Sequence, residues 1–297
     1  MDGILPLWKP KGLTSHDCVA KIRKIYQTKK VGHTGTLDPE VEGVLPICIG
    51  QATKIVQFLT ETNKTYIAEL QLGQTTETED SYGEIIEDVD VASFPSDKEI
   101  DNVLASFQGE ITQIPPMYSA VKVNGRKLYE YARANEFVER PKRQVNILYI
   151  ERLSINPKNN TIGFKVICSK GTYIRTLCVD IGEKLGYPAH MSFLKRTETG
   201  SFTEKEAITF EEISDAAERN DHHSLLRPIS VGVDHLAQLS VDQETKWRIA
   251  NGQKLPRPDK LPDTNPFVMM HDDELLAIYQ LHEKNPDEIK AVRVFNG

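Results

Sequence analysis

The sequence predicts an α+β protein with two domains, a large one over residues 1–230 and a small β-rich one over residues 231–297. Three observations lead to this prediction. The chain has 297 residues, about twice the length of a typical domain. Before residue 230, apolar residues recur at both strand and helix spacing. After it, short apolar runs alternate with tight polar turns.

The first 62 residues predict two helices separated by a loop and a strand. Ser15 can cap a helix that continues to about residue 30. Residues 32–43 are dense in Gly, Thr, Asp and Pro and therefore predict a loop. A short apolar strand over 44–49 and a helix from about Thr53 follow.

The middle of the chain predicts strands, an acidic turn and a basic insertion. Residues 64–72 alternate in polarity, so that Tyr66 lies on the apolar face of a strand. The acidic stretch 74–90 contains a turn between two strands. Residues 114–143, here called the basic insertion, contain an Asn124-Gly125 turn and leave the body of the domain.

The remaining elements alternate between helices and strands. Two strands, 145–155 and 161–169, precede a helix that begins after Gly171 and ends at Gly186. Thr209 and Glu212 form a capping box for another helix. The small domain is predicted to contain a helix and three strands, at 242–250, 267–270, 275–282 and 289–295.

Composition excludes several classes of protein. Cys18, Cys48, Cys168 and Cys178 are too few and too widely spaced for a disulfide scaffold or a zinc knuckle, and we expect Cys168 and Cys178 to be buried small hydrophobes. The chain shows neither a secretory signal nor an apolar run long enough to span a membrane, so we expect a cytoplasmic protein. Nucleotide-binding glycine motifs are missing, and His222-His223 lack a third ligand, so we expect no cofactor and no metal.

Charge is distributed unevenly. The net charge is −7, but residues 61–117 carry −11 and residues 118–175 carry +8. Such a basic block is either a solvated surface or a polyanion-binding face. The candidates for contacts to a polyanion are Lys122, Arg126, Lys127, Lys142 and Arg143.

The loop at residues 32–43 carries the strongest motif. Asp38 precedes a proline, which favours an extended conformation, and the surrounding Gly and Thr residues leave room for phosphates. Gly32-His33-Thr34-Gly35-Thr36-Leu37-Asp38-Pro39, Gly43-Val44-Leu45 and Gly50-Gln51-Ala52-Thr53-Lys54 together resemble the catalytic signature of the TruB-type tRNA pseudouridine synthases. Val41-Glu42 departs from it, since many members have Ala-Thr there.

Further motifs in the same order strengthen this resemblance up to about residue 200. They are Lys9-Pro10-x-Gly12-x-Thr14-Ser15, Lys64-x-Tyr66, Cys168-Ser169-Lys170-Gly171-Thr172-Tyr173-Ile174-Arg175 and Leu194-Lys195-Arg196. The resemblance implies the pseudouridine synthase fold, with a mixed, mainly antiparallel central sheet flanked by helices. The last 70 residues resemble the family's PUA-like RNA-binding domain loosely.

The resemblance also implies a reaction and its residues. The expected activity is isomerisation of uridine 55 in the T-loop of tRNA, by a monomer that needs no protein partner. Asp38 is the expected catalytic carboxylate, Arg175 its partner, and Tyr66 the platform on which the flipped uracil stacks. The further substrate-binding candidates are His33, Tyr173, Leu194 and Lys9, and the basic insertion would clasp the T-arm.

Three alternatives compete with this interpretation. A non-catalytic RNA-binding protein on the same scaffold would have no need of Asp38. A guide-directed relative of the dyskerin type would depend on partner proteins, and the short N-terminus before Lys9 disfavours it. A glycosidase would use Asp38 with Glu40 or Glu42, but carboxylates adjacent on one loop fit poorly with the ~5–9 Å separation of a glycosidase pair.

Overall fold

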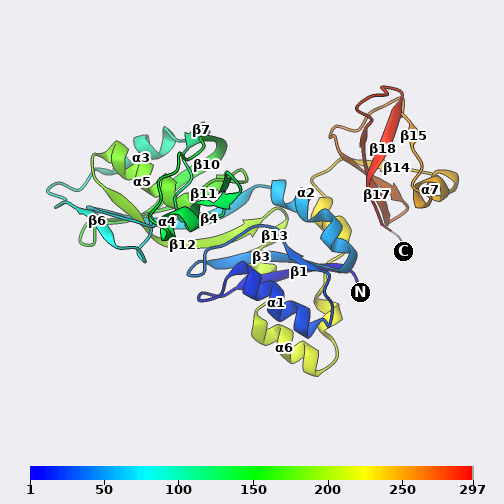
Figure 1. Cartoon of the computed structure of the whole chain (residues 1–297), viewed down its shortest axis with the longest axis horizontal. Coiled ribbons are helices and arrows are strands. Elements are labelled where there is room, and N and C mark those ends of the chain that lie inside the picture. The colour runs from blue at the N-terminus through cyan, green and yellow to red at the C-terminus, as the bar shows by residue number, and fades with distance from the viewer. Residues whose placement is uncertain (296–297) are drawn as a thin grey trace. The chain divides into compact units, whose positions relative to one another are not determined.

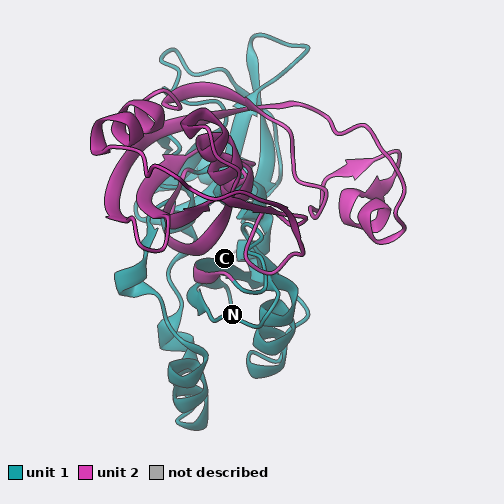
Figure 2. Ribbon diagram, turned by 90° about the vertical axis from the view of Figure 1, so that its left-hand side faces the viewer, with its two compact units in different colours: residues 1–40, 44–62, 200–297 teal, residues 41–43, 63–199 magenta. Residues whose placement is uncertain are grey.

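The computed structural model describes residues 1–295 and is drawn in Figure 1. The chain forms two compact units, coloured in Figure 2. Unit 1 contains residues 1–40, 44–62 and those from 200 onward, and unit 2 contains residues 41–43 and 63–199. The predicted domain boundary near residue 230 stays a prediction.

The N-terminal part of unit 1 is built on strands β1 and β3, which are neighbours in one sheet. Strand β2 pairs antiparallel with β3, with Val31 opposite Ile49. Apolar residues of β1, β3 and helix α1 form one core, and α1 and α6 lie close together in Figure 1. The elements here are β1 (Gly3–Lys9), α1 (Ser15–Ile25), β2 (Val31–His33), β3 (Glu42–Ile49), η1 (Gly50–Ile55), α2 (Val56–Glu61), β13 (Phe202–Thr203), η2 (Glu204–Glu206), α6 (Phe210–Glu218), η3 (His222–Leu225) and η4 (Ile229–Val233).

Helix α1 begins one residue earlier than the sequence predicts. Its N-cap is Thr14, whose hydroxyl accepts from the Asp17 N–H, while the Asp17 carboxylate accepts from the Thr14 N–H. These reciprocal bonds form a capping box and satisfy two N–H groups at the helix start. The prediction of Ser15 as the cap is therefore wrong, because the Ser15 hydroxyl binds the backbone of Leu37 instead.

The C-terminal part of unit 1 is a five-stranded sheet with the order β14-β16-β17-β18-β15. The three predicted strands and the predicted helix are confirmed, and two short strands are added. The elements are β14 (Gln238–Ser240), α7 (Gln243–Ala250), β15 (Leu255–Pro256), β16 (Phe267–His271), β17 (Glu274–Leu281) and β18 (Glu288–Val294).

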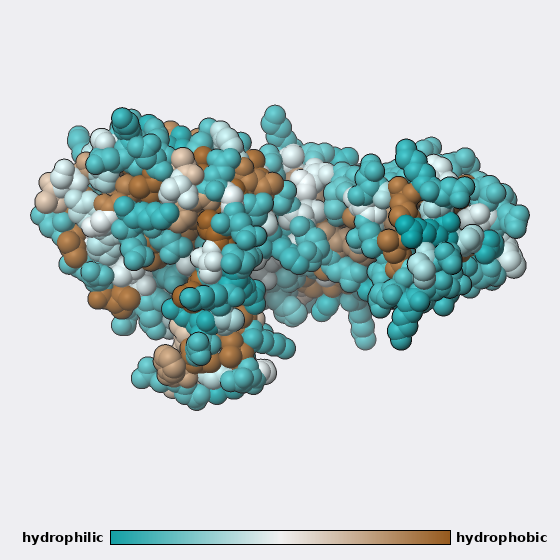
Figure 3. Space-filling view, turned by 90° about the horizontal axis from the view of Figure 1, so that it is seen from above, coloured by the Kyte–Doolittle hydropathy of each residue, from teal (hydrophilic) through white to brown (hydrophobic). Residues whose placement is uncertain are grey.

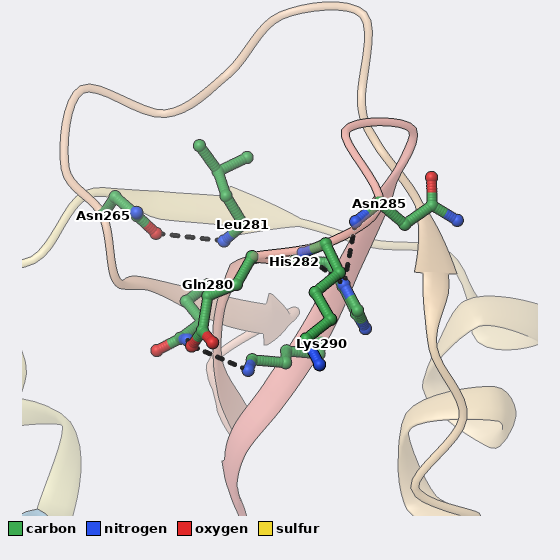
Figure 4. Close-up of polar contacts among 8 residues, drawn as sticks. Asn265, Gln280, Leu281, His282, Asn285 and Lys290 are labelled. Carbon is green, nitrogen blue, oxygen red and sulfur yellow. Dashed lines mark hydrogen bonds and ion pairs between the residues drawn. The ribbon is translucent and has the colours of Figure 1, made fainter.

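Polar contacts close the turn between β17 and β18 (Figure 4). His282 Nδ1 accepts from the Asn285 N–H over 3.1 Å, and Lys290 pairs with Glu283 over 3.0 Å. On the opposite side, Asn265 accepts from the Leu281 N–H. These bonds fix the backbone of a polar connection that has no apolar core of its own.

The C-terminal sheet buries both of its faces. One face forms a cluster with Ile249 of α7. On the other face, Val268, Met270 and Ile278 belong to an apolar cluster that also contains Ile4 and Val44. The β-rich segment therefore shares an apolar core with the first strands of the chain.

Unit 2 contains a sheet with the strand order β12-β4-β11-β10-β7. Every pair in this order is antiparallel, whereas Glu42 and Gly43 of β3 pair in parallel with β12. The mixed, mainly antiparallel sheet of the predicted fold is thus confirmed. The elements are β4 (Lys64–Leu72), β5 (Gln74–Thr76), β6 (Ile85–Asp88), α3 (Asp97–Ala105), β7 (Gly109–Gln113), β8 (Lys122–Val123), β9 (Arg126–Lys127), α4 (Leu128–Arg133), β10 (Arg143–Asn156), β11 (Thr161–Cys168), α5 (Ile174–Leu185) and β12 (Ala189–Thr199).

The predicted alternation of β4 and β11 is present in the sheet. Tyr66, Ala68, Leu70 and Leu72 are all buried on β4. Helix α5 packs against β4 and β12, and α3 packs against β10 and α5 (Figure 1). Gly43 has φ +138°, and a Cβ there would lie 2.2 Å from the Arg196 carbonyl oxygen, so this contact requires glycine.

All four cysteines are free and buried, which confirms the prediction made for Cys168 and Cys178. Burial raises the pKa of Cys168 to about 11 and that of Cys48 to about 12, so neither thiol is a nucleophile near neutral pH. Between residues 1 and 295, no helix is both long and apolar enough to cross a membrane. Seen from above, hydrophilic side chains cover most of the visible surface (Figure 3).

Candidate active site

The loop between β2 and β3 holds Asp38 between two fixed neighbours. On one side, the Leu37 N–H donates to the Ser15 hydroxyl over 2.9 Å, and that hydroxyl lies 3.3 Å from the Leu37 carbonyl. On the other, the Pro39 carbonyl accepts from the Gly12 N–H over 2.9 Å. Asp38 itself is half-buried. The backbone on both sides of the carboxylate is therefore restrained while the residue keeps access to solvent.

Lys9 supports the same loop from inside the protein. Its side chain is fully buried, and its ammonium group donates to the carbonyl oxygens of Pro39, over 3.0 Å, and Pro10, over 2.9 Å. Burying a cation is costly unless it is well hydrogen-bonded, and carbonyl oxygens provide such bonds. Sequence reasoning placed Lys9 among the substrate-binding residues; the structure places it under the Asp38 loop.

His33 and Thr34 begin the loop. Thr34 is fully buried, and its hydroxyl donates to the Pro46 carbonyl on β3. His33 is half-buried at the end of β2, with Nδ1 3.2 Å from the Gly35 carbonyl oxygen. The imidazole is thus held by its own loop and remains partly accessible.

Tyr66, Leu194 and Arg196 share one face of the unit 2 sheet. Tyr66 lies directly opposite Arg196, and Ala68 lies directly opposite Leu194, on the neighbouring strands β4 and β12. Tyr66 and Leu194 are each 8% exposed, and Arg196 is 1% exposed. A buried cation next to a buried aromatic ring is unusual in a core, which makes Arg196 a candidate that sequence reasoning did not single out.

Arg175 and Tyr173 stand at the start of helix α5. Tyr173 is the N-cap residue, and Arg175 lies in the first turn. Arg175 is buried, with its Nη1 donating to the Thr78 carbonyl over 2.8 Å and its Nη2 donating to the Tyr118 carbonyl over 2.9 Å. A surface arginine in a first helical turn has no such fixed partners, so this guanidinium is oriented by the backbone around it.

Sequence reasoning missed two polar residues close to Arg175. Gln113 is 2% exposed at the end of β7, and its side chain binds the backbone of Tyr173. Glu79 has a largely buried side chain that accepts from the Thr176 hydroxyl over 2.7 Å. The only sequence signal for Glu79 was its position in an acidic turn, and its partner lies 97 residues away.

The basic insertion forms a small structure of its own. Strands β8 and β9 make a hairpin whose turn residues, Asn124 and Gly125, both have positive φ, as the sequence predicts. Helix α4 follows, and its residues Leu128 and Tyr131 are buried. A groove of about 570 Å³ opens between the hairpin and the returning chain and is lined by Lys122, Val123, Asn124, Val138, Glu139, Arg140, Pro141 and Lys142.

The cations of the basic insertion differ in their surroundings. Lys122, Lys142 and Arg143 are exposed. Arg126 is also exposed but pairs with Glu136 over 2.7 Å and lies over the Tyr131 ring. Lys127 is half-buried beside Tyr129. Phe137, in the same segment, is 96% exposed.

Two other features bear on the chemistry available. Within residues 1–295, no three His, Cys, Asp or Glu side chains are grouped so that they could hold a metal ion. His222 and His223 lie in the short helix η3 and not in a loop; His223 is exposed, as the sequence predicts, whereas the His222 ring packs edge-on against Tyr26, whose hydroxyl donates to the His222 carbonyl.

Comparison with protein families assigns most of the chain. Residues 23–174 match the model of the TruB family pseudouridylate synthase N-terminal domain. Residues 175–237 match the model of the tRNA pseudouridylate synthase B C-terminal domain.

Individual relatives match almost the whole chain. The tRNA pseudouridine synthase B of Oceanobacillus iheyensis is 60% identical over 99% of this chain and 98% of its own length. That of Staphylococcus saprophyticus is 52% identical over 99% of both chains. Among solved structures, a Cbf5–Nop10–Gar1 complex matches with a TM-score of 0.77 and 32% identity, over 99% of this chain and 84% of that one.

Proposed function

The chain belongs to the TruB family of pseudouridylate synthases, and from this premise we propose that it converts uridine 55 in the T-loop of tRNA to pseudouridine. The observation that carries the proposal is the support of the Asp38 loop. Ser15, Gly12 and Lys9 restrain the residues on either side of Asp38, and Asp38 itself is half-buried. A fixed carboxylate is what this isomerisation requires of the protein.

The reaction breaks one bond to the sugar and forms another. The C1′–N1 bond of uridine is cleaved, the uracil rotates, and a C1′–C5 bond forms; C5 loses a proton and N1, which no longer bonds the sugar, takes one up. The product is an isomer of the substrate, so neither an oxidant nor a reductant is consumed. The protein must flip the uridine out of a folded loop, at a cost of a few kcal/mol, hold the base during rotation and move one proton.

Each candidate residue has a part in this scheme. We assign to Asp38, as a carboxylate, the action on the flipped nucleotide, and to Arg175 the role of its partner. Tyr66 stacks on the uracil, close to the C5 proton. His33, Tyr173 and Leu194 contact the flipped nucleotide or its phosphates. Lys9 is a positioning residue, since its ammonium group is buried beneath Pro39.

The basic insertion supplies the attraction to RNA. The net charge of −7 repels a polyanion at long range, whereas residues 118–175 carry +8. We assign phosphate contacts to Lys122, Arg126, Lys127, Lys142 and Arg143, and these contacts offset the cost of flipping the base. The acidic hairpin β5–β6 has the wrong sign for this role.

The test is incubation of the purified protein with an unmodified tRNA transcript, without ATP, added metal or other proteins. We expect one pseudouridine per tRNA, located at position 55 by chemical mapping. A product at another position would contradict the assigned site. A product that forms only after a guide RNA and partner proteins are added would favour the guide-directed alternative.

A further inference from the structure

Gln113 holds the backbone of Tyr173 with both ends of its amide. The Tyr173 N–H donates to Oε1 over 3.0 Å, and Nε2 donates to the Tyr173 carbonyl over 3.1 Å. Gln113 is the last residue of β7, immediately before the basic insertion. The start of helix α5 is therefore fixed by the residue from which the insertion leaves the sheet.

The Arg175 guanidinium also connects the start of helix α5 to the base of the insertion. Its Nη1 donates to the carbonyl of Thr78, in the acidic turn after β5, and its Nη2 donates to that of Tyr118, in the first residues of the insertion. The Thr78–Asp80 turn is itself fixed on β12, since the Met191 N–H donates to the Glu79 carbonyl over 3.0 Å. Any displacement of residues 115–118 thus moves an acceptor of Arg175.

Glu79 connects helix α5 to the C-terminal end of the insertion. One carboxylate oxygen accepts from the Thr176 hydroxyl, and the other lies 4.0 Å from Arg140. Arg140 also donates to the Pro115 carbonyl over 3.1 Å, which ties the two ends of the insertion together. Three residues at the start of α5, namely Tyr173, Arg175 and Thr176, are therefore bonded to the base of the insertion or to the turn that holds it.

These contacts lie in the protein interior, where the loss of a hydrogen bond costs more free energy than at the surface. Gln113, Arg175 and Thr176 are 2%, 5% and 7% exposed. The pKa of Glu79 is raised, because the effect of burial exceeds the lowering by the Thr176 hydrogen bond and by the charges of Arg175 and Arg140. A buried group that loses its partner retains its desolvation penalty, so the native arrangement of these residues is strongly preferred.

We propose that Gln113 and Glu79 are positioning residues that couple the base of the basic insertion to the orientation of Tyr173 and Arg175. The proposal rests on the proposed function, because it assumes that Tyr173 and Arg175 act on the RNA. In the complex, contacts to the insertion then restrain the start of α5 as well as contributing affinity. Losing the coupling lowers the rate of the chemical step, whereas losing cations of the insertion lowers affinity.

The experiment separates the rate constant at saturating tRNA from the Kd. Gln113→Met keeps the shape of the side chain and removes both hydrogen bonds to Tyr173. Glu79→Gln keeps an acceptor for Thr176 and removes the charge that faces Arg140 and Arg175. We expect each to lower the single-turnover rate constant about tenfold to a hundredfold, as misplacement of a reacting group does, with the Kd changed by less than about threefold.

A control on the same strand distinguishes coupling from general damage. Thr112→Val removes an exposed hydrogen bond to Gln144 on β10 and should leave both quantities unchanged. If Gln113→Met does not fold, as judged by thermal melting, Glu79→Gln decides the question alone. A rate constant within about twofold of wild type at saturating tRNA, or an equal loss in Thr112→Val, overturns the proposal. Lack of activity in the wild-type protein instead contradicts the proposed function.

Discussion

The buried ammonium group of Lys9 donates to the carbonyl oxygen of Pro39 over 3.0 Å, next to the candidate catalytic Asp38. The Pro39 carbonyl also accepts from the Gly12 N–H. The segment after β1 thus serves as a support for the Asp38 loop, and this explains why a lysine occupies the interior at the end of that strand.

Replacing Lys9 with Met should therefore impair both stability and catalysis. The change removes two hydrogen bonds and leaves the Pro10 carbonyl without this donor, so we expect a loss of about 1–3 kcal/mol in the free energy of unfolding. The single-turnover rate should also fall. Denaturant titration and rate measurements check this. Lys11→Met, at an exposed position two residues away, should change stability by less than about 0.5 kcal/mol.

Two substitutions at Tyr66 should have different effects. Phe keeps the ring and removes only the hydroxyl, so tRNA affinity should persist while the rate falls. Ala also removes the stacking surface, which is worth about 1–3 kcal/mol per base. The matched control is Tyr279→Phe, which removes a buried hydroxyl from the C-terminal sheet and should leave the rate unchanged. Equal activity in Tyr66→Phe, Tyr66→Ala and wild type would rule out Tyr66 as the base platform.

Neutralising the basic insertion should change how affinity depends on salt. Each neutralised phosphate contributes a log–log slope of about −0.7 to −0.9. Replacing Arg126, Lys127, Lys142 and Arg143 with Gln should weaken tRNA binding and make the slope shallower, with Arg126 contributing less because Glu136 already pairs with it. The rate at saturating tRNA should be affected less.

The control for this experiment neutralises four exposed cations elsewhere. Lys98, Lys158, Lys205 and Arg219 lie outside the insertion, and their replacement with Gln should leave the salt slope nearly unchanged. If the insertion variant keeps the wild-type slope, then the insertion is a solvated basic surface and other residues bind the phosphates.

Asp180 should make stability depend on pH. Burial first, and then the nearby Glu79 and Glu183 charges, raise the pKa of Asp180 to about 6. The folded protein then binds more protons than the unfolded chain between about pH 4 and pH 6, so stability falls as the pH rises through that range. Asp180→Asn should raise Tm at pH 7 and have little effect at pH 4. An equal effect at both pH values would show that charge is not the cause.

Periodicity and capping residues in the sequence predicted several helices and strands. Strand β4 was evident from its alternation, and helix α5 from its apolar stripe and Gly186 cap. Strand β1 was not predicted, because it is buried on both faces and contains Pro6, and so shows no alternation. Helix α3 was also missed, although Ser96 and Glu99 form a capping box in front of it.

Only the candidate site residues that lie within sequence motifs could be predicted. Asp38, Tyr66 and Arg175 lie in recognisable motifs, whereas Gln113 and Glu79 act through partners 60 and 97 residues away. Such contacts are set by the register of the sheet, which single-sequence patterns do not specify. The burial of Arg196 opposite Tyr66 has the same origin.

The central claim is that Asp38 is the catalytic carboxylate, and the most direct measurement is single-turnover pseudouridine formation by Asp38→Asn at saturating tRNA. Asn keeps the size of the side chain and loses its charge, while the contacts of Lys9, Gly12 and Ser15 to the loop backbone remain possible. We expect no detectable pseudouridine, with a tRNA Kd within about threefold of wild type, because the phosphate contacts lie elsewhere. Turnover close to the wild-type rate would contradict the account.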